Sequence, residues 1–384
     1  MTTELMKEGL LTNLPEDITR EILRRLPIRS IARCKCVCKS WREFGTLYSP
    51  KPGLAFANED TGFTACDEAF QPLCQFRPPL LHGDKCRYVI GSVDGLILVC
   101  AGYHFICEIL CICNPITREY IDLPPLCAYV LYDSNKVYGF GMSKLSGRYK
   151  VLCSDHMSCL VYTLGKRGYW RSISAAPGNP SMHRDKAAFF NGNLHWLASD
   201  SDENVFVCCL DLETEIITKY SIPSRDYGIK RIYGGYHLCI LEGRLCISDI
   251  LSPHGIVIWR MENYGDENSW IKEYTLDNLG GLFYPLVSLN DDLIIASNNR
   301  DNRELFIYSK TTETHVTHRR FPYSCLYSSV VIYTPSFISF ETMGIRNVQI
   351  LKNNIEEFDV ALEKVRCGWL AGGRIFDNRY VHKH

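Results

Sequence analysis

The sequence has no long hydrophobic run. No stretch of its 384 residues approaches the roughly 18 consecutive apolar residues that a membrane-spanning helix needs. Its N-terminal segment includes LPEDITREILRR, which is charged throughout and lacks the apolar core of a secretory signal peptide. We therefore expect a soluble intracellular chain without a membrane span, located in the cytoplasm, the nucleus or both.

A surplus of charge of one sign is also missing. Lys and Arg together number 42 and Asp and Glu 43, so the formal net charge is -1. A strongly basic chain would attract nucleic acid through its overall field, and this chain has no such field. We therefore expect no nucleic-acid partner.

The 46% hydrophobic content is enough to bury a large core in a chain of this length.

Catalytic signatures are absent as well. The sequence contains no HExxH, GxSxG, P-loop or GxGxxG motif. His183, His195 and Asp155 fall in different parts of the chain, and His195 lies inside a strand-like run, where a packed histidine is the simpler interpretation. Asp200 and Asp202 lie in a predicted turn, where solvated capping side chains are far commoner than catalytic dyads. We predict a non-catalytic protein without a cofactor.

The 19 cysteines do not predict a disulfide scaffold, because their number is odd, the chain is long and it has no Asn-x-Ser/Thr sequon. Cys34, Cys36 and Cys38 form an isolated cluster without the second ligand pair that structural zinc needs, and the nearest histidine is His82. We predict no metal site and reduced thiols that pack as small apolar side chains. Those in strand-like runs are Cys100, Cys111, Cys113, Cys153, Cys159, Cys208, Cys209, Cys239 and Cys246.

The N-terminal segment predicts short amphipathic helices. In NLPEDITREILRRLP, Ile18, Ile22 and Leu26 recur at a spacing of four, which places them on one helical face. Pro15 suits the first helical position, and Pro27 ends the helix. IRSIARCKCV predicts a second short helix, and SWRE at 40–43 fits a capping box that opens a third. Three such helices are too small to bury a core alone, so they either cap the following domain or bind a partner.

This segment resembles an F-box, whose landmarks are two Leu-Pro pairs and a Val-Cys-Lys-x-Trp ending. Here they are Leu14-Pro15, Leu26-Pro27 and VCKSW at 37–41. The resemblance implies docking on a Skp-family adaptor, which joins a cullin and a RING protein in an SCF-type ubiquitin ligase. We expect some of the apolar residues to bind the adaptor and others to hold the helices together. The candidates are Leu14, Pro15, Ile18, Ile22, Leu26, Pro27, Ile31, Val37 and Trp41.

From about residue 90 the sequence repeats at intervals near 49. The related segments ICNPIT, VYTLGK, CLDLET, WRMENY and IYSKTT begin at 112, 161, 209, 259 and 307. Each lies between an earlier strand-like run and a following one, which is typical of a propeller built from four-stranded blades. Five blades are readable in the sequence, and a sixth is expected from 327–333 and 337–340, completed by GLAFA at 53–57 from the other end of the chain. We therefore expect about six blades in an all-β propeller that follows a small all-α module.

CICNPITREYIDLP, AAFFNGNLHWLAS and IWRMENYG resemble the F-box-associated, kelch-like domain of large plant F-box families, which include relatives of the S-locus F-box proteins. The paired glycines of true kelch repeats are mostly missing. The expected domains are an F-box module at 1–50, a propeller at 51–340 and a tail at 341–384, in which 353–365 has helical spacing. The resemblance implies a substrate receptor that delivers a target protein for ubiquitylation and proteasomal degradation.

Two further interpretations remain open. The propeller could be a non-degradative binding module for glycans or proteins with a helical cap, or a scaffold that binds the adaptor and sequesters a partner. Aromatic side chains on loops could contact either kind of ligand, although we expect most of them to pack between blades. The loop candidates are Tyr169, Trp170, Tyr227, Tyr233, Tyr236, Tyr264 and Trp270. The target-binding residues are not predicted.

Overall fold

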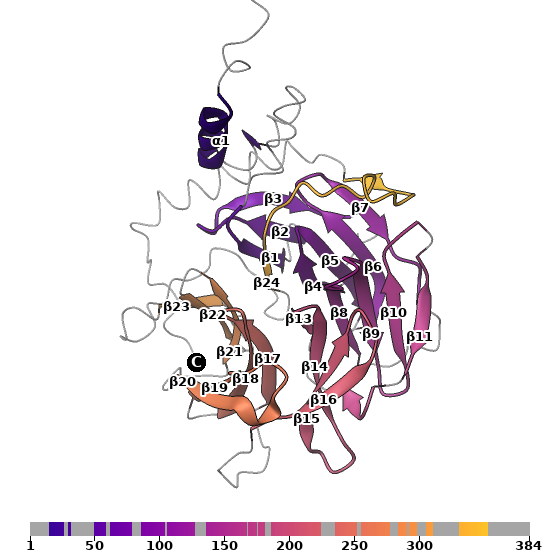
Figure 1. The fold of residues 1–384 in the computed structure, drawn as a ribbon, viewed down its shortest axis with the longest axis vertical. Helices are drawn as coiled ribbons and strands as arrows, with labels where there is room; N and C mark the ends of the chain where they lie inside the picture. The colour runs from indigo at the N-terminus through magenta and orange to yellow at the C-terminus, as the bar shows by residue number, and fades with distance from the viewer. Residues whose placement is uncertain are drawn as a thin grey trace, which may run out of the picture.

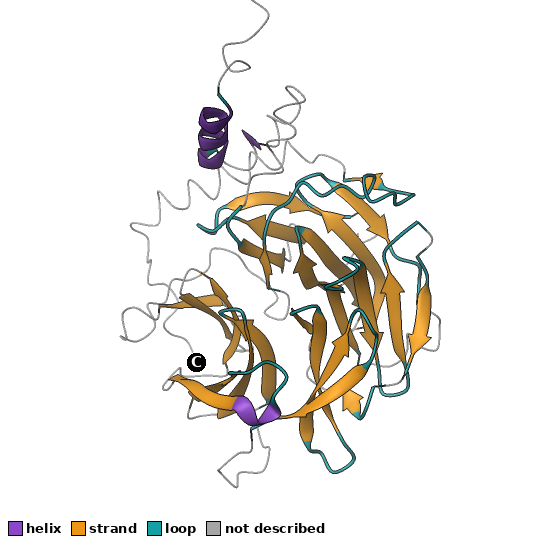
Figure 2. Ribbon diagram, viewed as in Figure 1, coloured by secondary structure: helices purple, strands orange, loops and turns teal. Residues whose placement is uncertain are grey.

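The structure is a computed structural model in which sheets are arranged around a common centre, with one N-terminal helix (Figure 1). Outside that helix nearly all the regular structure is β-strand (Figure 2). The residues that the structure describes are 15–26, 30–31, 50–58, 62–78, 86–103, 106–126, 136–166, 168–174, 176–180, 186–223, 235–251, 255–276, 283–289, 292–297, 305–309 and 330–351.

Helix α1 spans Glu16–Arg25, directly after Pro15 and two residues before Pro27. The predicted first helix is therefore confirmed within one residue at its start. Most of the second and third predicted helices lies outside the described residues, as does the helix predicted at 353–365.

Four sheets form blades A to D. Blade A has the strand order β24 (Val331–Tyr333), β1 (Gly53–Asn58), β2 (Gly62–Cys66) and β3 (Pro72–Phe76). Blade B contains β4 (Cys86–Val93), β5 (Leu96–Tyr103), β6 (Ile106–Asn114), β7 (Glu119–Asp122) and the edge strand β25 (Gln349–Ile350). Blade C contains β8 (Val137–Met142), β9 (Tyr149–Ser154), β10 (Cys159–Thr163) and β11 (Trp170–Ile173). Blade D contains β12 (Asn179–Pro180), β13 (Ala188–Phe190), β14 (Asn193–Ser199), β15 (Val205–Asp211) and β16 (Ile217–Ser221).

The fifth sheet, sheet E, joins two antiparallel meanders. The first contains β17 (Tyr236–Leu241), β18 (Arg244–Leu251), β19 (Gly255–Met261) and β20 (Trp270–Leu276), with a short 3-10 helix at Glu267–Ser269. The second contains β21 (Phe283–Leu289), β22 (Asp292–Ser297) and β23 (Leu305–Ser309). One parallel pair, Ile240 with Val287, connects them. The described strands thus form five sheets instead of about six, because this pairing fuses two repeats into one seven-stranded sheet.

Burial of both faces explains why the middle strands read as continuous apolar runs. In β15, VFVCCLD, the five central residues are buried, whereas the outer strand β16 of the same blade has none. Apolar clusters fill the space between successive blades, with Tyr333 and Ile97 between A and B, Phe140 between B and C, and Trp196 between C and D. The core is therefore a ring of blade-to-blade contacts.

Two-residue turns join several inner strands. Asn191-Gly192 and Glu242-Gly243 have positive φ at both residues, as does Asp94-Gly95. Such a pair matches the right-handed twist of the two strands it connects, and glycine adopts this backbone without strain.

Strands from both ends of the chain close the ring. Strand β24 pairs with β1 in register Gly53 with Tyr333 and Ala55 with Val331, as the sequence predicted. It also contacts β4 on one side and β21 on the other. The prediction of a strand at 337–340 is wrong, because these residues leave the sheet and pack over blade B.

Residues 334–351, which we call the C-terminal strap, cross from blade A to the outer edge of blade B (Figure 1). The Asn114 side-chain amide donates to the carbonyl oxygens of Ser336 at 3.1 Å and Ile338 at 2.8 Å. The Glu119 carboxylate accepts a hydrogen bond from the Phe340 backbone N–H at 2.6 Å. These contacts fix the segment that follows the closing strand.

Candidate functional site

Helix α1 presents an apolar stripe to solvent. Asp17 lies in its first turn, where a carboxylate interacts favourably with the positive end of the helix dipole. Ile18 and Ile22 are one turn apart and therefore share a face, and they are 51% and 38% exposed. Large apolar side chains that adjoin on the surface are typical of a face that another molecule covers.

The predicted docking residues that the structure describes differ in their exposure to solvent. Pro15, Ile18 and Ile22 are exposed, Leu26 is partly buried, and Ile31 is 1% exposed. An accessible stripe can contact a partner directly, whereas a buried side chain such as Ile31 can support packing within the chain. The other predicted positions, Leu14, Pro27, Val37 and Trp41, lie outside the described residues.

On the propeller, the turn between β15 and β16 is built around Asp211. Its Oδ1 accepts a hydrogen bond from the Glu213 backbone N–H at 2.7 Å, and its carbonyl oxygen accepts one from the Glu215 N–H at 2.8 Å. Glu215 has φ of 60°. The turn between β6 and β7 repeats this design with Asn114 and Arg118, whose φ is 66°. In both turns the side chain of the residue with positive φ contacts another segment of the chain.

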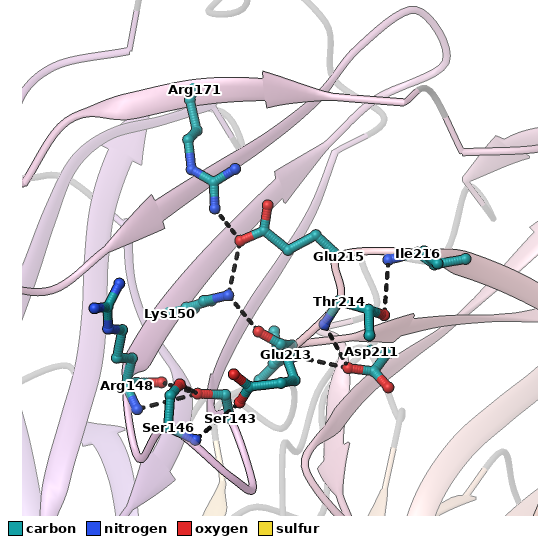
Figure 3. Close-up of polar contacts among 11 residues, drawn as sticks. Ser143, Ser146, Arg148, Lys150, Arg171, Asp211, Glu213, Thr214, Glu215 and Ile216 are labelled. Atoms are coloured by element: carbon teal, nitrogen blue, oxygen red, sulfur yellow. Dashed lines mark hydrogen bonds and ion pairs between the residues drawn. The ribbon is translucent and has the colours of Figure 1, made fainter.

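Glu215 connects blade D to blade C (Figure 3). Its Oε1 lies 2.7 Å from the Lys150 Nζ on β9 and also accepts a hydrogen bond from the Arg171 guanidinium on β11. Lys150 Nζ also donates to the Leu212 carbonyl oxygen. Burial acts to raise the pKa of Glu215, but the hydrogen bonds from Arg171 and Lys150 outweigh it, and its pKa lies below the ordinary value. The carboxylate is therefore ionised at neutral pH.

A second set of contacts fixes the turn between β8 and β9 against blade D (Figure 3). The Ser146 backbone N–H donates to Glu213 Oε2 at 2.9 Å, which lowers the pKa of that carboxyl. Two residues earlier, Lys144 Nζ donates to Asn191 Oδ1 at 2.9 Å. The tip residue Leu145 lies between them, directly before the anchored backbone N–H of Ser146.

Three of the residues considered for catalysis, His195, Asp155 and Asp200, have structural roles. His195 is fully buried, and its Nε2 lies 2.9 Å from the Tyr264 hydroxyl of the next blade. Burial lowers the pKa of His195 to about 4. Asp155 and Asp200 cap turns by accepting backbone N–H groups, as predicted for Asp200. His183 lies outside the described residues.

Most aromatic loop candidates in the described part of the chain pack between blades, as expected. The indole N–H of Trp170 donates to the Pro124 carbonyl oxygen at 2.8 Å, and that of Trp270 donates to the Ser221 carbonyl oxygen at 2.9 Å. The first bond joins blade C to the segment that follows the outer strand β7 of blade B, and the second joins sheet E to the outer strand β16 of blade D. Tyr169 differs, since it is 67% exposed.

The cysteine prediction is confirmed for the 11 cysteines whose side chains the structure describes. All 11 are free thiols, and the nine named above are buried. Burial raises the pKa of Cys208 and Cys246 to about 12, so these thiols are unreactive. Within the same residues no group of three or more His, Cys, Asp or Glu side chains could hold a metal ion. Cys34, Cys36 and Cys38 lie outside them.

The described helices include none that is long and apolar enough to span a bilayer.

The sequence reasoning missed several residues that shape the propeller surface, chiefly Lys150, Arg171 and Glu215. Their one signal was the recurrence of CLDLET in the repeat, which places Glu215 after a third strand. The cross-blade partners are 65 and 44 positions away in the chain.

The closed ring of sheets and the helix before it define a β-propeller protein with a separate N-terminal module. Two family matches agree with this class. The F-box domain matches residues 11–47, and the F-box associated beta propeller domain matches residues 74–325, more than half of the chain. The protein therefore belongs to the family of F-box proteins with an associated β-propeller. Neither family description names a catalytic activity.

Similar proteins carry F-box names. F-box protein At3g07870 of Arabidopsis thaliana is 29% identical over 70% of this chain and 73% of its own length. The F-box/kelch-repeat protein At3g23880 of the same plant is 24% identical over 77% of this chain and 87% of its own. Among solved structures, AofleA from Arthrobotrys oligospora covers 74% of this chain and 90% of its own, with a TM-score of 0.43 and 10% identity, which is too distant to support an argument.

Proposed function

We propose that this protein is the substrate-recognition subunit of an SCF-type ubiquitin ligase. The F-box segment docks on a Skp-family adaptor, which links it to a cullin and a RING protein, and the propeller binds a target protein for ubiquitylation and proteasomal degradation. The observation that carries the proposal is the exposed pair Ile18 and Ile22 on α1, inside the matched F-box region and ahead of a propeller.

The chemistry of this role needs no catalytic group on the chain. A receptor of this kind raises the effective concentration of target lysines near a ubiquitin-charged enzyme held elsewhere in the assembly. The structural roles of His195, Asp155 and Asp200 agree with such a role, because each side chain is committed to packing or to a turn.

Co-purification of the full chain with a purified Skp-family adaptor tests the docking step. Burying an aliphatic side chain contributes about 1.5–3 kcal/mol, so placing a carboxylate on this face should weaken binding at least about ten-fold. We expect Ile18→Asp and Ile22→Asp to lose the adaptor. Asp17→Ala is the control, since this exposed residue lies about 100° around the helix from Ile18.

Wild type that fails to bind several such adaptors would refute the docking step, as would Ile18→Asp and Ile22→Asp variants that bind as well as Asp17→Ala. If the adaptor binds, the degradative role is tested by following a bound target with and without proteasome inhibition. A target that is bound but not stabilised by the inhibitor would identify a sequestering scaffold instead.

A further inference from the structure

Three large apolar side chains are exposed on the turns of blades C and D. Leu145 lies between β8 and β9, Tyr169 directly before β11, and Ile216 directly before β16, and they are 86%, 67% and 61% exposed. Strands in a blade run antiparallel, so the first and third turns of each blade lie at the same end of the sheet. We call the segments 143–148, 164–169 and 211–216, where they are described, the C/D turn surface.

This surface has few counterparts on the described propeller. Its three residues are half of the large hydrophobic side chains exposed there, the others being Met157, Ile271 and Ile350. Met157 lies between β9 and β10, at the opposite end of blade C, whereas Ile271 and Ile350 lie on outer strands of other sheets. Exposed apolar side chains therefore gather at one end of neighbouring blades.

Contacts between blades C and D hold the backbone beside two of these side chains, Leu145 and Ile216, before any partner binds. The Ser146 backbone N–H, directly after Leu145, donates to Glu213 Oε2 of blade D at 2.9 Å, and the Ser143 backbone N–H donates to the Arg148 carbonyl oxygen across the turn at 2.9 Å. Ile216 follows Glu215, which is held by the ion pairs that Figure 3 shows. Little conformational entropy is then lost on binding, which favours affinity per side chain.

The charge around the apolar residues is net positive, because five cations lie there with three carboxylates. The cations are Lys144, Arg148, Lys150, Lys166 and Arg171, and the carboxylates are Asp211, Glu213 and Glu215. Lys144, Arg148 and Lys166 are exposed, and no carboxylate of the described chain lies within ion-pair distance of them. Lys150 and Arg171 share the single carboxylate of Glu215. The carboxylate of Glu215 is therefore occupied by Lys150 and Arg171, while Lys144, Arg148 and Lys166 have no ion-pair partner among the described residues.

We propose that the C/D turn surface binds the target, as an acidic protein segment that carries large apolar side chains. Apolar side chains of the segment pack on Leu145, Tyr169 and Ile216, and its carboxylates pair with Lys144, Arg148 and Lys166. This inference rests on the proposed function, in which the propeller is the target-binding part of the chain.

A phage-displayed library of linear 16-residue peptides, panned on the full-length protein, supplies the probe. We expect selected peptides to be enriched in Asp and Glu together with Leu, Phe, Tyr or Trp. A synthetic peptide from the selection should bind at least ten-fold more weakly to Leu145→Asp and to Arg148→Glu, and its affinity should fall with added salt. Met157→Asp is the matched control and should bind as wild type does.

Selected peptides without acidic enrichment would overturn the proposal. So would a peptide whose binding is unchanged by Leu145→Asp, or weakened equally by Met157→Asp. Each variant is also tested for adaptor binding and for its urea midpoint. If adaptor binding is retained but the peptide predictions fail, only the target-binding role of the C/D turn surface is refuted. If wild type does not bind the adaptor, the proposed function is refuted.

Discussion

The Glu215→Gln substitution tests whether the buried ion pairs hold blades C and D together. The paired side chains of Lys150 and Glu215 are 7% and 12% exposed, so the variant leaves a buried ammonium without its counter-charge. Breaking a buried ion pair costs about 3–5 kcal/mol. Gln keeps an acceptor, and Arg171 is 39% exposed and can be solvated. We therefore expect a smaller loss in the free energy of unfolding, about 2 kcal/mol.

Urea unfolding at pH 7, followed by tryptophan fluorescence, measures this loss as a lower midpoint at an unchanged slope. Glu203→Gln is the matched control. Glu203 is exposed, has a similar φ of 64°, and its side chain has no polar partner among the described residues. We expect the control to stay within about 0.5 kcal/mol of wild type. A Glu215→Gln variant as stable as Glu203→Gln would refute the role assigned to the ion pairs.

The pH dependence gives a second test of the same residue. The folded pKa of Glu215 is lowered, so its contribution is present above the unfolded value of about 4.3 and is lost as the pH falls through the folded pKa. The difference between wild type and Glu215→Gln should therefore shrink below about pH 4. A difference that stays constant into acid would show that the charge is not responsible.

Two other sites give predictions. Burial lowers the pKa of His195 to about 4, so the stability that it contributes above about pH 6.5 is lost as the pH falls toward 4. His195→Gln should reduce the fall in urea midpoint between pH 7 and pH 5, and an unchanged fall would contradict this. Asn114→Asp keeps the turn cap but loses two bonds to Ser336 and Ile338, so we expect a loss of about 2–3 kcal/mol. The reciprocal Asp211→Asn should be nearly neutral by the same assay, and equal losses would refute the assignment.

The strands of the propeller were predictable because each repeat carries its own local signal. Runs such as NLHWLAS and VFVCCLD are apolar and bounded by turn residues, and both became strands. The interval near 49 then indicated several strands per repeat. The pairing of β24 with β1 followed from the physical need to leave no open sheet edge.

The number of separate sheets was not predictable in this way. It depends on whether two inner strands approach closely enough to pair, and Ile240 with Val287 does so at one position. No local pattern encodes the distance between two repeats. The strap was missed for a different reason: 337–340 is apolar enough for a strand, but it follows Pro335, whose backbone cannot donate a hydrogen bond to a sheet.

The Glu215 network shows the same limit at the level of a site. In isolation DLETE is an ordinary turn, and its last glutamate could equally be solvated. Its partners Lys150 and Arg171 come from two strands of another blade, and the curvature of the ring brings them together. On α1, by contrast, the spacing of Ile18 and Ile22 was sufficient to predict that the two side chains share a face, because a helix alone sets the geometry of both residues.

Ring closure also depends on strands from outside the matched propeller family region. The matched propeller family region, 74–325, ends before β24 and begins after β1 and β2, so it leaves out three of the four strands of blade A. A fragment cut at those bounds would uncover the inner strands β4 and β21, which β24 contacts in the full chain. The strand that follows the F-box region, β1, is thus hydrogen-bonded into the ring that carries the C/D turn surface. In the proposed function, the closed ring holds the C/D turn surface rigidly, which suits a receptor that acts through position alone.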